Sequence, residues 1–273
     1  MVAQPLSSAR RVDYDRIAPT YDRRFAADRQ EPIALALRAL AGELGAGGTG
    51  RPARVLEVGC GTGRWLADLE PVTYQLYGLD LSTGMLQRAH GRSDGLFLVR
   101  GQAERLAFAN AAFDLVYCVN ALHHFDRPRA FVAEARRLLR PGGRLAVIGM
   151  DPRCYRGRWY AYRYFAGVLE ADLRRFPSWG TILDWMVAEG FVGVECRLVQ
   201  RIVAPKVGRA VLDDPFLRKD ACSQFVLLSE RAYAAGLGHI EIALAEAEAA
   251  GEEIVFPVDL CLSMLTGQVP ERG

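Results

Sequence analysis

Three glycines spaced two residues apart form the part of the chain best suited to holding a ligand on its backbone. Gly59, Gly61 and Gly63 follow a short apolar run and precede a helical pattern, which predicts a strand, a turn and a helix. Glycine lets the main chain turn sharply and approach a ligand with no Cβ atom in the way. A dinucleotide-binding turn would need its third glycine at the position of Arg64, so an NAD-dependent dehydrogenase is the least favoured class.

Acidic side chains close the two strands predicted on either side of this turn. Glu57 ends the first strand, and Asp80 ends a second apolar strand, residues 74–79, 23 positions further along the chain. A carboxylate at the end of the second strand can accept both hydrogen bonds of a ribose diol. The alternative is that Asp80 caps the next helix, although Ser82 is the better N-cap residue. The spacing therefore favours a nucleoside ligand over a simple capping role.

Two adjacent histidines follow a further buried strand, residues 113–119. His123 and His124 are the histidines expected near the glycine turn, whereas His90 and His239 are expected to be solvated or structural. A histidine with a pKa near neutrality can take a proton from a phenol or an enol. The alternative is that the pair forms hydrogen bonds with the backbone and shapes the pocket floor, and the residue types alone leave both roles open.

Taken in order, these segments resemble the motifs of the class I S-adenosylmethionine (SAM)-dependent methyltransferases. The similarity is to the small-molecule branch that resembles the ubiquinone and menaquinone C-methyltransferases. It covers about residues 12–152 and includes the glycine turn, Asp80, the segment 101–108, the run that starts at Asn120 and the Pro-Gly-Gly turn 141–143. Five motifs in this order and at this spacing are far more specific than a glycine turn alone.

The resemblance implies a set of site residues. The cofactor-binding residues would be Tyr21, Glu57, Gly59, Cys60, Gly61, Gly63, Asp80, Leu81, Met85, Gln102, Ala103, Glu104 and Asn120, and the catalytic candidates His123 and His124. Glu57 is expected near the methionine amine or as an orienter of the loop, and Leu81 and Met85 beside the adenine. Gln102 stands where the family usually has aspartate, and it keeps an accepting oxygen without the charge. No metal site is expected, because the six cysteines are scattered and form no C-x-x-C pair.

The implied reaction is an in-line displacement that moves a methyl group from SAM to an O, N or C atom of a small organic molecule. Positioning of the nucleophile and exclusion of water would be the main contribution of the protein. A general base is needed only when the acceptor loses a proton. Two other functions remain open: a SAM-binding protein with a cyclase-like or structural role, and an RNA methyltransferase that uses the arginine- and aromatic-rich segment 153–165.

The alternation of strand and helix patterns from Ala53 to Met150 predicts an α/β fold with helices on both faces of a parallel sheet. The resemblance refines this to a Rossmann-like, doubly wound sheet of seven strands whose last strand, residues 254–265, is antiparallel. The predicted units are a helical lid (1–50), a SAM-binding core (51–203 and 252–273) and a mostly helical cap (204–251). The segment 153–165 is interpreted as an aromatic helix that roofs the site.

Length and composition set wider bounds. A chain of 273 residues, half of them hydrophobic, suits one large domain or a domain with a lid. The 34 basic and 32 acidic residues nearly balance, so no nucleic-acid partner is expected. No stretch approaches the ~20 apolar residues of a membrane span, and the first eleven residues lack the apolar region of a signal peptide. These patterns predict a cytoplasmic protein with no membrane partner, either a monomer or a homodimer.

Overall fold

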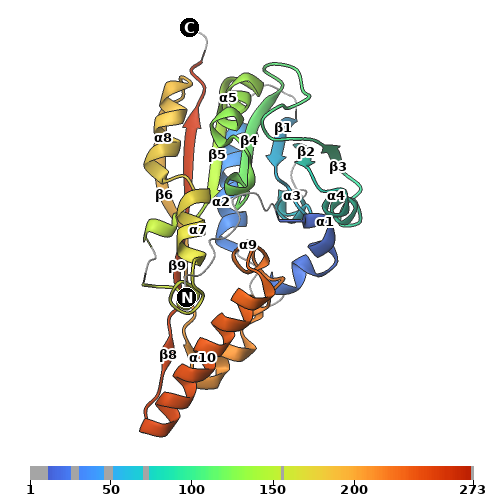
Figure 1. Cartoon of the computed structure of the whole chain (residues 1–273). Helices are drawn as coiled ribbons and strands as arrows, with labels where there is room; N and C mark the ends of the chain where they lie inside the picture. The colour runs from blue at the N-terminus through green and yellow to red at the C-terminus, as the bar shows by residue number, and fades with distance from the viewer. Residues whose placement is uncertain (1–11, 26–30, 46–51, 70–73, 155–156, 272–273) are drawn as a thin grey trace.

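A seven-stranded sheet forms the centre of the protein (Figure 1). The computed structural model describes residues 12–25, 31–45, 52–69, 74–154 and 157–271. The sheet contains β1 (Ala53–Val58), β2 (Tyr74–Asp80), β3 (Leu96–Arg100), β4 (Phe113–Val119), β5 (Leu139–Gly149), β6 (Val192–Val203) and β9 (Asp259–Gln268). Their order is β3-β2-β1-β4-β5-β9-β6, and β9 runs antiparallel to both β5 and β6. The predicted α/β class and the antiparallel last strand are confirmed.

Helices cover both faces of this sheet because its central strands are apolar on both sides. In β4, Val116 and Tyr117 are both fully buried, but they belong to two different hydrophobic clusters. Successive residues of a strand point to opposite faces, so a continuously apolar strand must be covered twice. The covering helices are α5 (Pro128–Leu138) and α8 (Trp179–Ala188) on one face, and α2 (Glu31–Gly45) and α3 (Arg64–Leu69) on the other.

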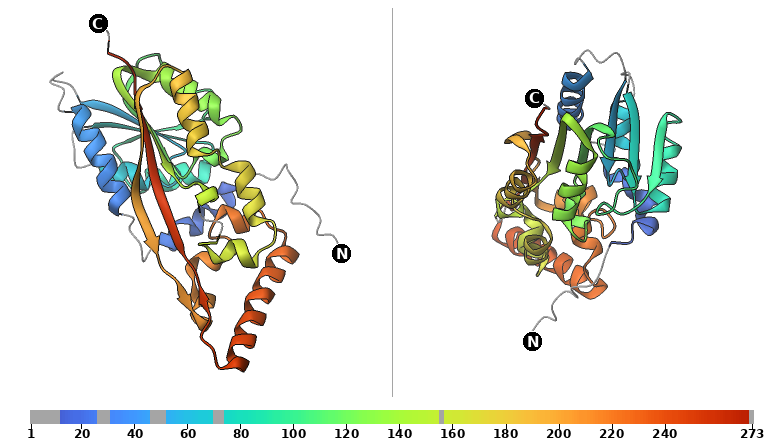
Figure 2. Two further views of the ribbon diagram at one scale, coloured as in Figure 1. Left: turned by 90° about the vertical axis from the view of Figure 1, so that its left-hand side faces the viewer. Right: turned by 90° about the horizontal axis from the view of Figure 1, so that it is seen from above.

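The strands β6 and β9 extend beyond the rest of the sheet and carry a second hydrophobic core (Figure 2). A short ribbon of β7 (Lys206–Val207) and β8 (Val255–Phe256) continues this arm. The long helix α10 (Glu230–Ala250) lies beside the arm; it begins at the N-cap Ser229 and ends at Gly251 in the left-handed conformation. Glycine suits this helix end, because it adopts a positive φ without a steric penalty.

The cap also recruits residues from the segment before β6. Tyr160 and Phe165 share one buried cluster with Phe225, Ile240 and Phe256. The remaining helices are α1 (Tyr14–Ile17), η1 (Ala18–Phe25), α4 (Thr83–His90), η2 (Leu122–His124), η3 (Pro152–Cys154), α6 (Tyr160–Tyr164), α7 (Val168–Arg175), η4 (Gly208–Asp213), η5 (Pro215–Leu217) and α9 (Ser223–Val226). The core of the cap is therefore assembled from two stretches of chain, whereas the sequence predicted a single insertion, 204–251.

The last strand differs from its predicted bounds of 254–265. Residues 255–256 pair with β7 in the separate ribbon, and the sheet strand β9 begins only at Asp259. The interruption falls at Pro257, which has no N–H to donate to a neighbouring strand. The Pro257 carbonyl instead accepts a hydrogen bond from the Tyr160 amide at 2.8 Å, which ties α6 to this turn.

Three parts of the predicted lid lie outside the described residues: 1–11, 26–30 and 46–50. Across the ranges that the structure does describe, no helix combines the length and the apolar character needed to cross a membrane.

We expect Gly236→Ala in α10 to destabilise the cap. A Cβ atom at this position would lie 2.1 Å from Cδ1 of Phe165, so the ring must move. The free energy of unfolding should fall by about 1–3 kcal/mol, as is usual for overpacking. The matched control is Gly238→Ala in the same helix, where a Cβ meets nothing within 4 Å and should add about 0.5–1 kcal/mol. Urea unfolding measures both, and equal effects would contradict this packing.

Candidate active site

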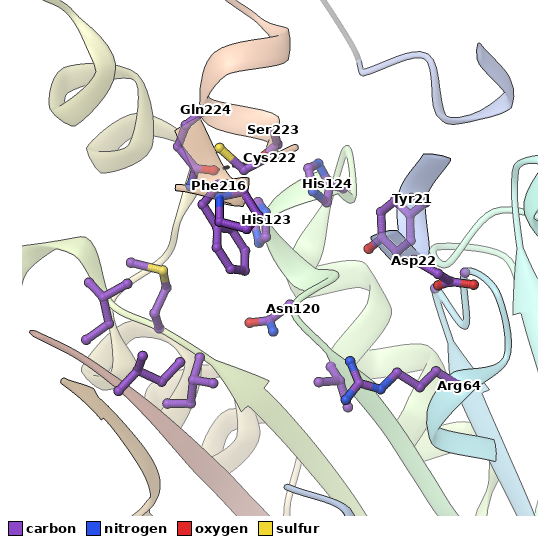
Figure 3. A pocket seen from close by; sticks show the side chains of 18 of the residues that line it. Tyr21, Asp22, Arg64, Asn120, His123, His124, Phe216, Cys222, Ser223 and Gln224 are labelled. Carbon is purple, nitrogen blue, oxygen red and sulfur yellow. Dashed lines mark hydrogen bonds between the residues drawn. The ribbon is translucent and has the colours of Figure 1, made fainter. Parts of the chain in front are cut away.

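A cavity of about 410 Å³ lies where the carboxyl ends of β1 and β4 meet the cap (Figure 3). Ligands of open α/β sheets bind at this edge, outside the carboxyl ends of the strands. Of the predicted site residues, the cavity is lined by Tyr21, Glu57, Gly59, Cys60, Gly61, Asn120, His123 and His124. The fold therefore brings together eight residues that span about a hundred positions of the sequence.

The glycine loop between β1 and α3 is held against the end of β2. The amides of Gly59 and Cys60 both donate to the carbonyl of Leu79, at 2.7 and 3.0 Å. A Cβ atom on Gly59 would lie 2.6 Å from that of Ala121, so only glycine allows this approach. Gly61 has a φ of +53° and no atom within 4 Å of the place a Cβ would take. The loop thus offers its backbone to a ligand at Gly61.

The carboxylate of Asp80 connects the glycine loop to the start of α4. Its Oδ2 accepts from the Gly61 amide at 2.8 Å, and its Oδ1 accepts from the Ser82 amide at 2.9 Å. Ser82 is the N-cap of α4, as expected, because its hydroxyl accepts from the Met85 amide. Partial burial raises the pKa of Asp80 above its ordinary value, although these hydrogen bonds oppose the shift. Asp80 is thus hydrogen-bonded to the glycine loop, and both are predicted to bind the same ligand.

Glu57 is a buried acid with one unsatisfied oxygen. Its side chain is 1% exposed, and Oε2 accepts a hydrogen bond from the Tyr117 hydroxyl at 3.2 Å. Oε1 has no hydrogen-bond partner among the described residues. Burial raises the pKa of Glu57 well above its ordinary value, and the nearby carboxylates of Asp80 and Asp68 raise it further. A buried oxygen of this kind is costly unless a donor reaches it, so this wall of the cavity is suited to a cationic group.

Asn120 ends β4 in a conformation that few residues adopt. Its φ is +49°, in the left-handed region, while its amide still donates to the Ile148 carbonyl at 2.8 Å. Asparagine tolerates this region better than most residues, and such backbone strain is often found at functional sites. The side chain of Asn120 points into the space between the glycine loop and the cap (Figure 3).

The two histidines differ in their surroundings. The ring of His123 stacks on Phe176, with centroids 3.8 Å apart and an interplanar angle of 12°. Its deep position lowers the pKa of His123 well below the ordinary value, helped by the nearby His124 and Arg175. Nε2 of His124 instead shares a 2.6 Å hydrogen bond with the Tyr14 hydroxyl. His123 is thus a neutral part of the wall, and His124 is the better placed of the two to exchange a proton.

Comparison with known proteins agrees with this geometry. Residues 56–147 match the protein family described as "Methyltransferase domain". Residues 56–147 are a methyltransferase domain. The chain is 38% identical over 137 residues to a malonyl-acyl-carrier protein O-methyltransferase of Hahella chejuensis, which covers 48% of this chain and 46% of that protein. It is 39% identical over 112 residues to a phthiotriol/phenolphthiotriol dimycocerosates methyltransferase of Mycobacterium leprae, covering 39% and 41%. These matches span less than half of each relative.

The fold comparison extends beyond the methyltransferase domain. The structure of Haemonchus contortus phosphoethanolamine N-methyltransferase 2 in complex with S-adenosyl-L-methionine aligns with a TM-score of 0.57 at 16% identity. The alignment covers 94% of this chain and 57% of that one. At this identity the likeness concerns the fold alone, the seven-stranded Rossmann-like sheet with its helices.

Seven of the predicted cofactor-binding residues do not line this cavity. They are the loop residue Gly63, the predicted ribose acceptor Asp80, and the residues predicted near the adenine, Leu81, Met85, Gln102, Ala103 and Glu104. Met85 is 1% exposed and packs against Ile17 and Ala18 of the N-terminal segment. Glu104 accepts a hydrogen bond from the Arg127 amide, and Leu81 is 44% exposed. The adenine contacts thus stay a prediction.

The sequence analysis selected only Tyr21 of the N-terminal segment as a site residue. Asp22 accepts from the Thr62 hydroxyl at 2.8 Å and pairs with Arg92 at 2.7 Å, so η1 is tied to the glycine loop. Tyr14 reaches His124 from the preceding helix. A signal was present in the chain, because the dipeptide Tyr-Asp occurs at 14–15 and again at 21–22.

Sequence reasoning also did not identify the apolar half of the cavity. Its apolar lining comprises Met150, Trp159, Phe176, Ile202, Ala204, Pro215, Phe216, Val258, Leu260 and Leu262. These residues come from six separate stretches of the chain and form no local motif. From the segment predicted to roof the site, Trp159 reaches the cavity, whereas Tyr160, Tyr164 and Phe165 are buried in the cap.

We expect Glu57→Gln to stabilise the protein in a pH-dependent way. A carboxyl whose pKa is raised by folding destabilises the folded state progressively as pH rises from its unfolded value towards its folded value. The neutral amide escapes this penalty. The gain in unfolding free energy should therefore be larger at pH 8 than at pH 5, measured by urea unfolding. Glu252→Gln, at an exposed position, is the control and should show no such dependence. A gain for Glu57→Gln that is independent of pH would exclude a raised pKa.

Proposed function

We propose that this protein is a SAM-dependent methyltransferase that acts on a small organic molecule. The observation that carries the proposal is the unsatisfied Oε1 of Glu57 in the same cavity as the open backbone of Gly61. SAM presents an ammonium group and a ribose diol. Glu57 at the end of β1 is suited to the ammonium group, and Asp80 at the end of β2 is suited to the diol. The structural relative described above contains SAM, and residues 56–147 match the methyltransferase domain family.

The described residues fit the parts of the cofactor. Glu57 would receive the ammonium group, because its free oxygen lacks a donor. Asp80 would receive the ribose, since each of its oxygens accepts one backbone hydrogen bond and keeps a further lone pair. Gly61 and Asn120 would contact the amino-acid end of SAM, and Tyr21 would help to enclose it.

SAM supplies an activated methyl group, so the protein needs mainly to align the acceptor and exclude water. The N-terminal segment closes one side of the cavity through Tyr14 and Asp22, and the cap closes another. For an acceptor that loses a proton, His124 is the proposed base, with the Tyr14 hydroxyl holding its ring in place. The low pKa of His123 makes it a weak base.

Of the two alternatives, a cyclase-like or structural SAM-binding protein would use the same polar half of the cavity. An RNA methyltransferase is disfavoured by the contacts of the segment 153–165. Its aromatic residues Tyr160, Tyr164 and Phe165 are buried, and Arg153 and Arg158 pair with acids of the protein itself. The cytoplasmic location and the monomeric or dimeric state stay predictions.

We expect Asp80→Ala to weaken binding of S-adenosylhomocysteine, the product form of the cofactor, by at least about tenfold, as the loss of a charge-assisted pair implies. The substitution removes the ribose acceptor and releases the Gly61 amide. Isothermal titration calorimetry measures the affinity. Asp94→Ala, at an exposed position, is the control and should bind like the wild type.

The melting temperature of each variant shows whether it is folded. Wild-type affinity in a folded Asp80→Ala variant would exclude the proposed ribose site. A wild-type protein that binds the product form but yields no methylated product across broad acceptor pools would favour the cyclase-like or structural alternative.

A further inference from the structure

The apolar half of the cavity has a floor built from one face of the β6–β9 arm. Ile202, Ala204 and Lys206 occupy every second position of one extended segment. Val258, Leu260 and Leu262 do the same in the antiparallel segment beside it, and all six residues line the cavity. Side chains two positions apart in an extended chain share a face. The exposure of these side chains follows the same alternation, because residues 202, 204 and 206 are half-buried while 201, 203, 205 and 207 are exposed. The floor is therefore apolar from the sheet edge outward and ends in a charged residue.

The side chain of Lys206 faces the interior of the cap. Lys206 pairs with Phe256 across the β7–β8 ribbon, and residues directly opposite each other point to the same face. Phe256 is fully buried in the cap core. The next pair, Val207 and Val255, is 42% and 52% exposed and therefore occupies the outer face. The ribbon thus directs the ammonium group of Lys206 towards the cavity that this residue lines.

The charge of Lys206 is not matched by a neighbouring acid. No carboxylate of the described residues lies within the 4.0 Å of an ion pair with its Nζ. Asp214 also lines this part of the cavity, but its Oδ2 accepts from the Tyr160 hydroxyl and its Oδ1 from the Phe216 amide, both at 3.0 Å. At the glycine-loop end of the cavity, Asp22 is paired with Arg92. A charge interacts more strongly in a cavity with apolar walls than in bulk water, so this half-buried ammonium group is suited to an anion from outside the protein.

We propose that the methyl acceptor is an elongated apolar carboxylate whose charge is held by Lys206. Its apolar body would lie along Ile202, Leu260 and Leu262, and its far end would reach Asn120 and His124. The assignment rests on the proposed function, which places methyl transfer at the glycine-loop end of the cavity. The carboxylate is then the anchor of the acceptor, and the methylated atom lies at the opposite end.

A single ammonium group favours a monoanion over a phosphate. Phosphate sites usually combine several donors, such as arginine side chains or a series of backbone amides. The other cation of the cavity lining, Arg64, belongs to the glycine-loop end. Ten apolar residues of the lining contribute hydrophobic contact, which favours an apolar body over a sugar or a short polar acid.

The test compares an acid with its neutral analogue. Protein saturated with S-adenosylhomocysteine is titrated with 10-hydroxydecanoic acid and with 10-hydroxydecanamide, which differ only in charge and in the terminal group. We expect the wild type to bind the acid at least tenfold more tightly than the amide. Lys206→Met should reduce this preference to less than twofold, and Lys206→Arg should retain most of it.

The matched control is Arg209→Met, which removes the same charge three residues further on. Arg209 lies on the outer surface, where it pairs with Glu241 and Glu248 of α10, and its removal should leave the preference intact. Equal binding of acid and amide by the wild type, no binding of either, or an unchanged preference in a folded Lys206→Met variant would each overturn the inference. Binding of S-adenosylhomocysteine is measured first, so its loss would instead count against the proposed function.

Discussion

The hydrogen bond between the Gly61 amide and the Asp80 carboxylate joins the two parts of the chain on which the site depends. This bond holds the glycine loop after β1 against the turn after β2. A second hydrogen bond, from the Gly59 amide to the Leu79 carbonyl at 2.7 Å, holds the same two segments together. Both strands are parallel neighbours, so their carboxyl ends meet at one edge of the sheet. The open backbone of Gly61 and both acids therefore face one region without any long-range adjustment.

The N-terminal segment completes the site by contacting each of its parts. Asp15 accepts from the Ser82 hydroxyl and the Gly84 amide at the start of α4, and Asp22 accepts from Thr62 in the glycine loop. Thr20 donates to Asp220 of the cap at 3.0 Å. One short segment thus connects the core to the cap across the cavity. Any movement of this segment would affect the glycine loop and the cap together.

A buried polar network joins α9 to α6 and α7. Asp172 is fully buried and accepts hydrogen bonds from Tyr162, Arg175 and Gln224. Burial raises the pKa of Asp172, while its partners oppose the shift. Removal of one partner from such a network is costly, because it leaves a buried charge without compensation. Gln224 also lines the cavity, so the same network orients a polar group of its wall.

The sequence by itself determined the sheet, the glycine turn and the ends of several helices, since these depend on local patterns. Alternating apolar residues, the Ser82 cap and Gly251 act within a few positions of the chain. It also selected Glu57 and Asn120, because motifs at strand ends keep their spacing. Only the tertiary structure decided the apolar half of the cavity, the Tyr14–His124 contact and the inward position of Lys206. These depend on pairings between distant segments, for which no local pattern is required.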